Sequence, residues 1–208
     1  MKGNKIEKDS PMALKKKNKR ERLINAAIKL LSEKGYANTK IKDIASEAKV
    51  ADGTVYSYFS SKEDLMMKAL TESLHNKLIE VKQITSQETD VRTKILKFFD
   101  IHAIVFTQNP HIAKFLIEDI RQIKEYYDKY PSFSIFDEYR EYMKEIFNEG
   151  IQKGMFRNVS AEAFGLTVIG AMDFVLTQWV LKKQNFDLRN MVLKIIDLIH
   201  YGSGKENE

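Results

Sequence analysis

Apolar residues recur at helical spacing through almost the whole chain, and this restricts the fold strongly. Near the start, Leu23, Ala27, Leu30 and Leu31 follow the spacing of an amphipathic helix with one buried stripe, and Gly35 is an expected left-handed cap. We therefore expect an all-α fold. The same spacing predicts later helices near residues 62–86, 90–108, 111–130, 133–153, 161–183 and 187–201.

One stretch departs from this pattern. Residues 53–59, GTVYSYF, are rich in the β-branched and aromatic residues that favour strands. A lone strand in a helical chain would leave its backbone donors and acceptors without partners. As a helix, the stretch places Val55 and Phe59 on one face, able to complete a core with the two preceding helices. We therefore expect a short helix here, preceded by a helix whose N-cap is Thr39.

Two helices joined by the KVAD turn form a helix-turn-helix, which in DNA-binding proteins places its second helix in the major groove. Charge supports this interpretation, because residues 1–68 contain sixteen Lys and Arg against nine Asp and Glu, whereas the remainder of the chain is net −2. Double-stranded DNA is the expected partner. The candidate DNA-contacting residues are Thr39, Lys40, Ala51, Asp52, Gly53, Thr54, Tyr56, Ser57, Tyr58 and Lys62.

The chemistry of these residues suits DNA. Gly53 lacks a Cβ and allows close approach, while the Thr54 hydroxyl can meet a phosphate or a base edge. The Tyr56 and Tyr58 phenols can donate to phosphate oxygens, and Lys62 begins the next helix, where a phosphate can be held. Ordinary packing of the tyrosines is the alternative.

The run RLINAAIKLLSEKGYANTKIKDIASEAKVADGTVYSYFSSKEDL, residues 20–65, resembles the DNA-binding domain of TetR-type transcriptional regulators. The resemblance implies a homodimeric repressor that leaves its operator when a larger C-terminal domain binds a small molecule. The expected domains are a basic flexible arm over 1–16, the helix-turn-helix domain over 17–64, and a ligand-binding and dimerisation domain over 65–204. Ala51 stands where the family often has a capping serine, so Asp52 must provide any side-chain cap.

Two C-terminal segments have more apolar surface than one core can cover. Residues 161–181 are apolar nearly all round, and residues 135–151 have a wide apolar stripe. We expect these helices to form a four-helix dimer interface, as the resemblance implies, although both could be central helices of a monomer. The candidate interface residues are Ile146, Phe147, Gly170 and Phe174.

Short C-terminal motifs, including EGIQKG at 149–154 and TQWV at 177–180, are similar to the fatty-acid-degradation branch of the family, whose inducers are long-chain acyl-CoAs. The alternative is a regulator that senses aromatic or cationic drugs, with Glu118, Asp119 or Asp173 facing the pocket; a structural DNA binder without a cavity is a third reading. The candidate pocket residues, each of which could equally be plain core, are Phe99, His102, Phe106, Phe115, Arg121, Tyr126, Met143, Met172 and Trp179.

Other classes of protein find little support. The chain has no cysteine, its four histidines share no ligand-like spacing, and GSGK at 202–205 lacks the first glycine of a phosphate-binding loop. We therefore expect no metal, no cofactor and no enzymatic activity. The charged N-terminus and the apolar runs, which fall short of a membrane span, predict a cytoplasmic protein with no membrane partner.

Overall fold

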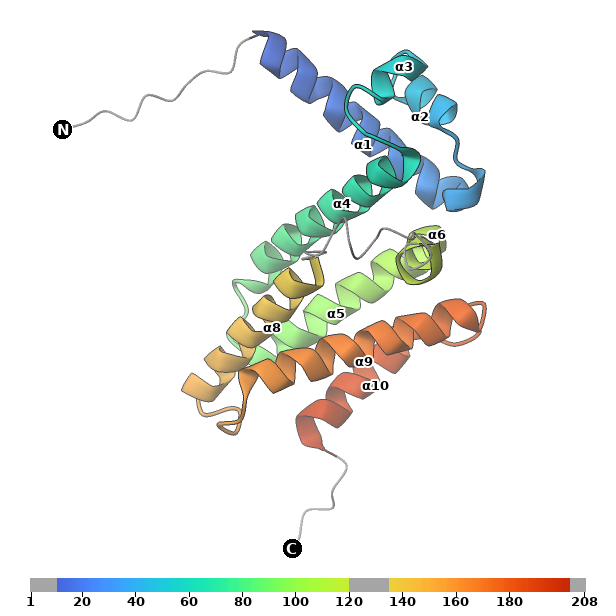
Figure 1. Ribbon diagram of the computed structural model, residues 1–208. Coiled ribbons are helices and arrows are strands. Elements are labelled where there is room, and N and C mark those ends of the chain that lie inside the picture. Colours follow the sequence, from blue (N-terminus) through green and yellow to red (C-terminus); the bar gives the residue numbers. More distant parts are fainter. Residues whose placement is uncertain (1–10, 120–134, 203–208) are drawn as a thin grey trace, which may run out of the picture. The chain divides into compact units, whose positions relative to one another are not determined.

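The computed structural model describes residues 11–119 and 135–202, which form two compact units (Figure 1). The first unit ends at Leu70 and the second begins at Thr71, so the boundary lies inside helix α4, Lys62–Thr85. Every regular element in the described ranges is helical, which confirms the all-α prediction.

The first unit contains three helices and the start of α4: α1 (Pro11–Asn38), α2 (Ile41–Glu47) and α3 (Asp52–Val55). Helix α1 begins at Pro11, so residues 11–16 are helical rather than part of a flexible arm. Gly35 interrupts α1 with a φ of 77°, a conformation that glycine adopts without steric cost. Apolar side chains from all four helices fill the core, which includes Leu23, Leu31, Ile44, Val55, Phe59 and Leu65.

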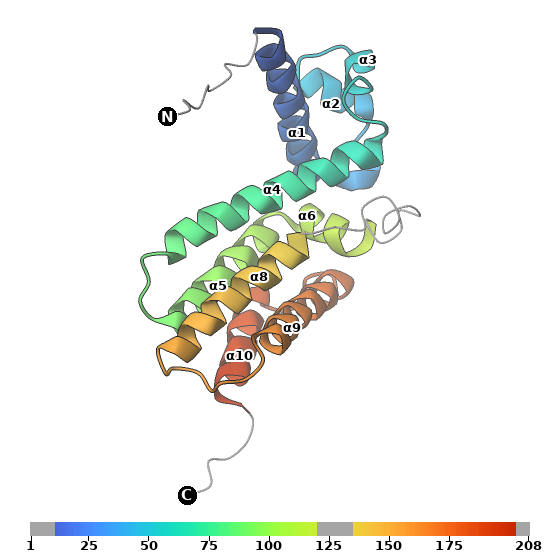
Figure 2. The same cartoon turned by 60° about the vertical axis from the view of Figure 1, so that its left-hand side comes forward.

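The second unit is a helical bundle. Helix α5 contacts α8 and α10, and α9 contacts the same two helices, as both views show (Figure 1, Figure 2). The side chains of Asp90, Ser160 and Asp187 accept hydrogen bonds from the first turns of α5, α9 and α10, so these helices begin at sequence-encoded caps. The elements after α4 are α5 (Val91–Gln108), α6 (Pro110–Lys114), the π-helix η1 (Phe115–Asp119), α8 (Ile135–Gln152), α9 (Ala161–Leu181) and α10 (Leu188–Tyr201).

The segment after Pro110 differs from the single α-helix expected over 111–130. Helix α6 ends at Lys114 and continues into the wider turns of η1, whose Phe115, Leu116 and Ile117 are buried. The remainder of the expected helix, residues 120–130, lies outside the described residues. A π-helical turn changes which side chains face inward, which α-helical periodicity cannot predict.

Helix α9 is an exception to the expectation that every apolar run falls short of a membrane span. Within the described residues it is the one helix that is long and apolar enough, by length and composition, to cross a membrane. In this fold it packs against α8 and α10, and Gly165 allows the close approach to α8, since a Cβ there would meet the Arg140 Cγ at 3.0 Å. Part of its apolar surface is therefore used inside the bundle.

Candidate DNA-binding surface and ligand pocket

Residues 53–59, whose composition favours a strand, form α3 and the turns that follow it. After α3, the amides of Tyr58 and Phe59 both donate to the Val55 carbonyl at 3.0 Å, so helical turns continue beyond the helix end. Val55 and Phe59 are buried, while Tyr56 is 61% exposed on the opposite side. Tertiary packing of these two apolar residues thus overrides the local β-propensity.

Most of the candidate DNA-contacting residues lie on this outer side. Thr54 and Tyr58 are half-buried. A Cβ placed on Gly53 would meet no atom within 4 Å, so the protein's own packing does not require glycine there. The exposed members of the set are Lys40, Ala51, Asp52, Gly53, Tyr56 and Ser57.

Thr39 is a correction to the predicted contacts. Its side chain is fully buried, and its hydroxyl donates to the carbonyls of Gly35, at 2.7 Å, and Leu30, at 3.3 Å. The N-cap of α2 is Lys40, whose amide donates to the Asp43 carboxylate. Thr39 therefore closes the end of α1 instead of facing DNA.

Lys62 is half-buried and already engaged within the unit. Its ammonium donates to the Tyr36 carbonyl at 2.7 Å and lies 4.0 Å from the centroid of the Tyr36 ring. The Tyr36 hydroxyl in turn donates to Glu63, and although burial alone would raise the pKa of Glu63, hydrogen bonds led by this one hold it below its usual range. A DNA phosphate at Lys62 would have to share the ammonium with Tyr36.

Two basic features of this unit were missed from the candidate set. The Arg22 guanidinium donates to the carbonyls of Ala48 and Lys49, which fixes the turn between α2 and α3, where Lys49 has a φ of 54°. On the start of α1, Lys16, Lys17 and Arg20 surround an open surface hollow together with Tyr58. These cations add to the positive charge beside α3; the general basicity of residues 1–22 was the available signal.

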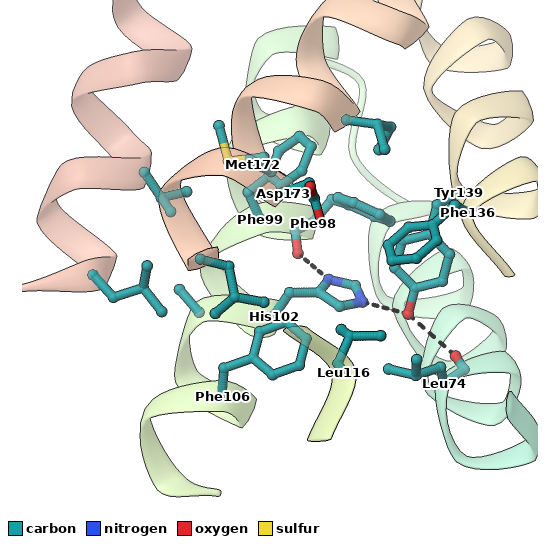
Figure 3. A pocket seen from close by; sticks show the side chains of 15 residues that line it. Leu74, Phe98, Phe99, His102, Phe106, Leu116, Phe136, Tyr139, Met172 and Asp173 are labelled. Carbon is teal, nitrogen blue, oxygen red and sulfur yellow. Dashed lines mark hydrogen bonds between the residues drawn. The ribbon is translucent and has the colours of Figure 1, made fainter. Parts of the chain in front are cut away.

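The second unit contains an apolar cavity of about 80 Å³, the central pocket (Figure 3). Side chains from α4, α5, η1, α8, α9 and α10 surround it, and nearly all are aromatic or aliphatic. Its lining is Leu74, Phe98, Phe99, His102, Ala103, Phe106, Leu116, Phe136, Tyr139, Ile169, Met172, Asp173, Leu176, Leu188 and Val192.

A short hydrogen-bond chain crosses the wall of this pocket (Figure 3). His102 Nδ1 lies 2.6 Å from the Phe98 carbonyl, and its Nε2 lies 2.8 Å from the Tyr139 hydroxyl, which is 3.2 Å from the Leu74 carbonyl. Burial lowers the pKa of His102 to about 4 and raises that of Tyr139. At neutral pH His102 is therefore uncharged, with Nδ1 donating to Phe98 and Nε2 accepting from Tyr139. The single hydroxyl proton of Tyr139 is then directed to His102, and the longer contact with the Leu74 carbonyl can only share that proton.

The structure brings some of the candidate pocket residues together and separates others. Phe99, His102, Phe106 and Met172 line the central pocket. Leu74 and Tyr139 also line it and were missed; they are 65 residues apart, and no local pattern connects them. Candidates placed elsewhere in the buried core are Phe115, Met143 and Trp179, whereas Arg121 and Tyr126 lie outside the described residues.

The three acids named for a drug-sensing regulator do not all face the central pocket. Glu118 and Asp119 both pair with Lys114, at 3.1 and 3.4 Å. Asp173 alone among the three named acids lines the central pocket. Of these three acids, Asp173 is therefore the one that the alternative reading places correctly.

Two of the four candidate interface residues are buried and two are exposed. Ile146 and Phe147 are buried inside the subunit, with the Phe147 ring stacked 4.1 Å from that of Phe164, so they offer no surface to a partner and that part of the prediction is wrong. Gly170 is exposed, and Phe174 is 63% exposed, on the outer side of α9. The outward positions of α8 are mostly charged, so the apolar surface left for a partner lies on α9.

A helix-turn-helix unit followed by a helical unit with an apolar pocket is an organisation found in transcriptional regulators. Residues 23–69 match the bacterial regulatory proteins of the tetR family, and residues 52–202 match the C-terminal region of YsiA-like proteins. The chain belongs to the TetR family of transcriptional regulators.

The relatives of this chain include regulators of fatty acid metabolism. The fatty acid metabolism regulator protein of Bacillus subtilis is 25% identical over 189 residues, covering 90% of this chain and 96% of that protein. The fatty acid degradation regulator FadR of Bacillus halodurans has a TM-score of 0.75 and 27% identity, covering 95% of this chain and 98% of its own. FadR of Bacillus subtilis in complex with stearoyl-CoA has a TM-score of 0.75 and 25% identity, with 88% and 99% covered.

These comparisons confirm the resemblance to the fatty-acid-degradation branch. The relatives are transcriptional regulators and not enzymes, which confirms the expectation for this chain.

Proposed function

We propose that this chain is a cytoplasmic, homodimeric repressor that leaves its operator when a long-chain acyl-CoA binds the second unit. The observation that carries the proposal is the central pocket, an almost wholly apolar cavity inside the bundle of a TetR-family regulator. A FadR relative at 25% identity has been solved with stearoyl-CoA, which supports an acyl-CoA as the ligand class.

Operator binding is assigned to the outer side of α3 and the turn after it. Gly53 and Tyr56 are exposed there without a packing role, and the cations of α1 lie in the same unit. The helix supplies base-edge and phosphate contacts, while the lysines and arginines supply the salt-dependent part of the affinity.

Dimerisation is assigned to the outer side of α9. Leu166, Gly170 and Phe174 follow at intervals of four residues and are all exposed, and Leu181 extends the same apolar surface. A Cβ on Gly170 would meet no atom within 4 Å, so this glycine leaves room for a close helix from a partner subunit. A second α9 would cover this row.

The size of the central pocket implies movement on ligand binding. Its volume of about 80 Å³ is well below the roughly 300–1,000 Å³ of typical ligand sites. An acyl chain can enter only a wider conformation, in which side chains such as Met172 and Phe106 have moved. Such a ligand shifts the equilibrium toward that conformation, and release follows if the wider form binds operator poorly.

The test is a titration of operator-bound protein with acyl-CoAs of increasing chain length. Each additional buried methylene contributes roughly 0.8 kcal/mol before ordering costs, so the concentration required for release should fall as the chain lengthens. Free CoA and free fatty acid are the controls.

Asp173 supports one alternative, a regulator released by an aromatic or cationic drug. Its carboxylate lines the central pocket beside aromatic rings, an arrangement suited to a cation. Release by an aromatic cation, with no dependence on acyl chain length, would favour this alternative.

A further inference from the structure

A second cavity lies at the other end of the same helices. It has a volume of about 230 Å³, and we call it the arginine pocket because Arg92 and Arg157 both line it. Its apolar wall includes the stacked rings of Phe147, Phe156 and Phe164, and His200 completes its polar side. The cavity thus combines an aromatic interior with cationic groups.

The two cavities follow one another along α5, α9 and α10. Ile95, Val168 and Ile196 line the arginine pocket. The residues four positions away on each helix, toward the central pocket, are Phe99, Met172 and Val192, and these line the central pocket. Four residues rise about 6 Å along a helix, so the cavities are separated by roughly one layer of side chains on all three helices.

The cations of the arginine pocket have donors to offer. Arg92 pairs with Asp197 through Nη2, but its Nε is buried with no hydrogen-bond partner in the described part of the chain. Arg157 is exposed and forms no ion pair with any described residue. An anionic group of a ligand could therefore bind Arg157 without breaking an existing ion pair, and charge-assisted bonds of this kind are strong.

We propose that the two cavities are the two ends of one path, in which the acyl chain occupies the central pocket and the CoA phosphates bind Arg157 and Arg92. This inference rests on the proposed function. The central pocket is too small and too apolar to hold phosphates, whereas the arginine pocket provides cations at the other end of an apolar route. Along α5, the path from Arg92 to Phe106 spans fourteen residues, or about 21 Å, which suits an extended long acyl chain.

The layer of side chains between the cavities must open for the chain to pass. Ile95, Val168 and Ile196 are aliphatic and buried, so they can change rotamer without breaking a side-chain hydrogen bond. A larger side chain at Val168 would close the route while leaving both arginines in place. The two ends of the path can therefore be tested separately.

The experiment measures binding of stearoyl-CoA, stearate and a short acyl-CoA to the full chain by calorimetry. Arg157→Gln should weaken stearoyl-CoA by about tenfold, as expected for one lost charge-assisted contact, and leave stearate unchanged. Lys194→Gln is the matched control, because Lys194 is exposed on α10 and lines neither cavity. Val168→Phe, checked for folding by circular dichroism, should weaken the binding of stearoyl-CoA more than the binding of the short acyl-CoA.

The outcomes separate this inference from the proposed function. If the unaltered protein binds stearoyl-CoA but Arg157→Gln and Arg92→Gln bind it equally well, the path is wrong and the proposed inducer stands. If Arg157→Gln weakens the binding of stearoyl-CoA and of stearate equally, Arg157 does not hold the phosphates, and the proposed ligand path is again wrong. If the unaltered protein binds no acyl-CoA, the proposed function fails and the path fails with it.

Discussion

At the scale of single residues, His102 links the packing of the second unit to its chemistry. It is buried among the Phe98 and Tyr139 rings, with ring centroids 4.5 and 4.9 Å away, and both of its nitrogens have hydrogen-bond partners. Burial disfavours the charged imidazolium and lowers the pKa of His102 to about 4, against an ordinary value near 6.5.

This lowered pKa predicts a pH dependence of stability. Below about pH 6.5 the unfolded chain binds a proton at His102 that the folded chain does not accept until about pH 4, so stability falls through this window as pH falls. The gap between the two pKa values corresponds to roughly 3 kcal/mol at most. Chemical denaturation at pH 7 and pH 4 should show a smaller loss in His102→Gln, with His111→Gln as the control. Parallel losses in all three proteins would contradict this assignment.

Gly53 offers a second test at the same scale. Gly53→Ala should leave folding unchanged or slightly more stable, because alanine is the better helix residue and its Cβ would meet no atom. Operator affinity should fall by about 1–3 kcal/mol if DNA approaches the backbone closely, with Tyr56→Ala causing a loss of similar size. Fluorescence anisotropy on a duplex selected from random sequence measures both. Unchanged affinity in a folded protein would remove the altered residue from the contact surface.

At the scale of elements, helices with clear caps could be predicted well from the sequence. The segment expected near 62–86 is α4, Lys62–Thr85, and those that start at Asp90, Ser160 and Asp187 also begin as expected. Thr39 was wrongly predicted as the N-cap of α2 because threonine is a common capping residue. The sequence does not show that its hydroxyl instead donates to the Gly35 carbonyl. The π-turns after Lys114 have no periodic signature.

The candidate interface shows why the partner of an apolar stripe is hard to predict. The stripe on α8 is wide because α5, α9 and the rings of Phe156 and Phe164 all cover it, so Phe147 is needed inside the subunit. Periodicity measures how much apolar surface a helix has, but not whether its own chain or a partner covers it. Only α9 retains exposed apolar residues in a row, including Phe174, within the described helices of this pair.

Phe174→Asp tests the α9 interface. An acid in an apolar interface would be buried without a partner, so the particle should shift toward the mass of a monomer while the subunit stays folded. Light scattering measures the mass. Met191→Asp is the matched control, since it adds the same acid at an exposed apolar position of α10. An unchanged mass for Phe174→Asp would place the interface elsewhere.

At the scale of the whole molecule, α4 is the element that belongs to both units, since it starts at Lys62 and the boundary falls after Leu70. Its Leu74 lines the central pocket, and the Leu74 carbonyl lies within hydrogen-bond distance of Tyr139. We propose that a ligand that widens the pocket acts on this helix, whose first turns belong to the first unit.

The most direct test of the account is release of operator-bound protein by acyl-CoAs of graded chain length, followed by fluorescence anisotropy. The account predicts that the concentration for half-release falls steadily with chain length until the apolar path is full, and that free CoA releases nothing. A response that is flat across chain lengths, beside strong release by an aromatic cation, would contradict it.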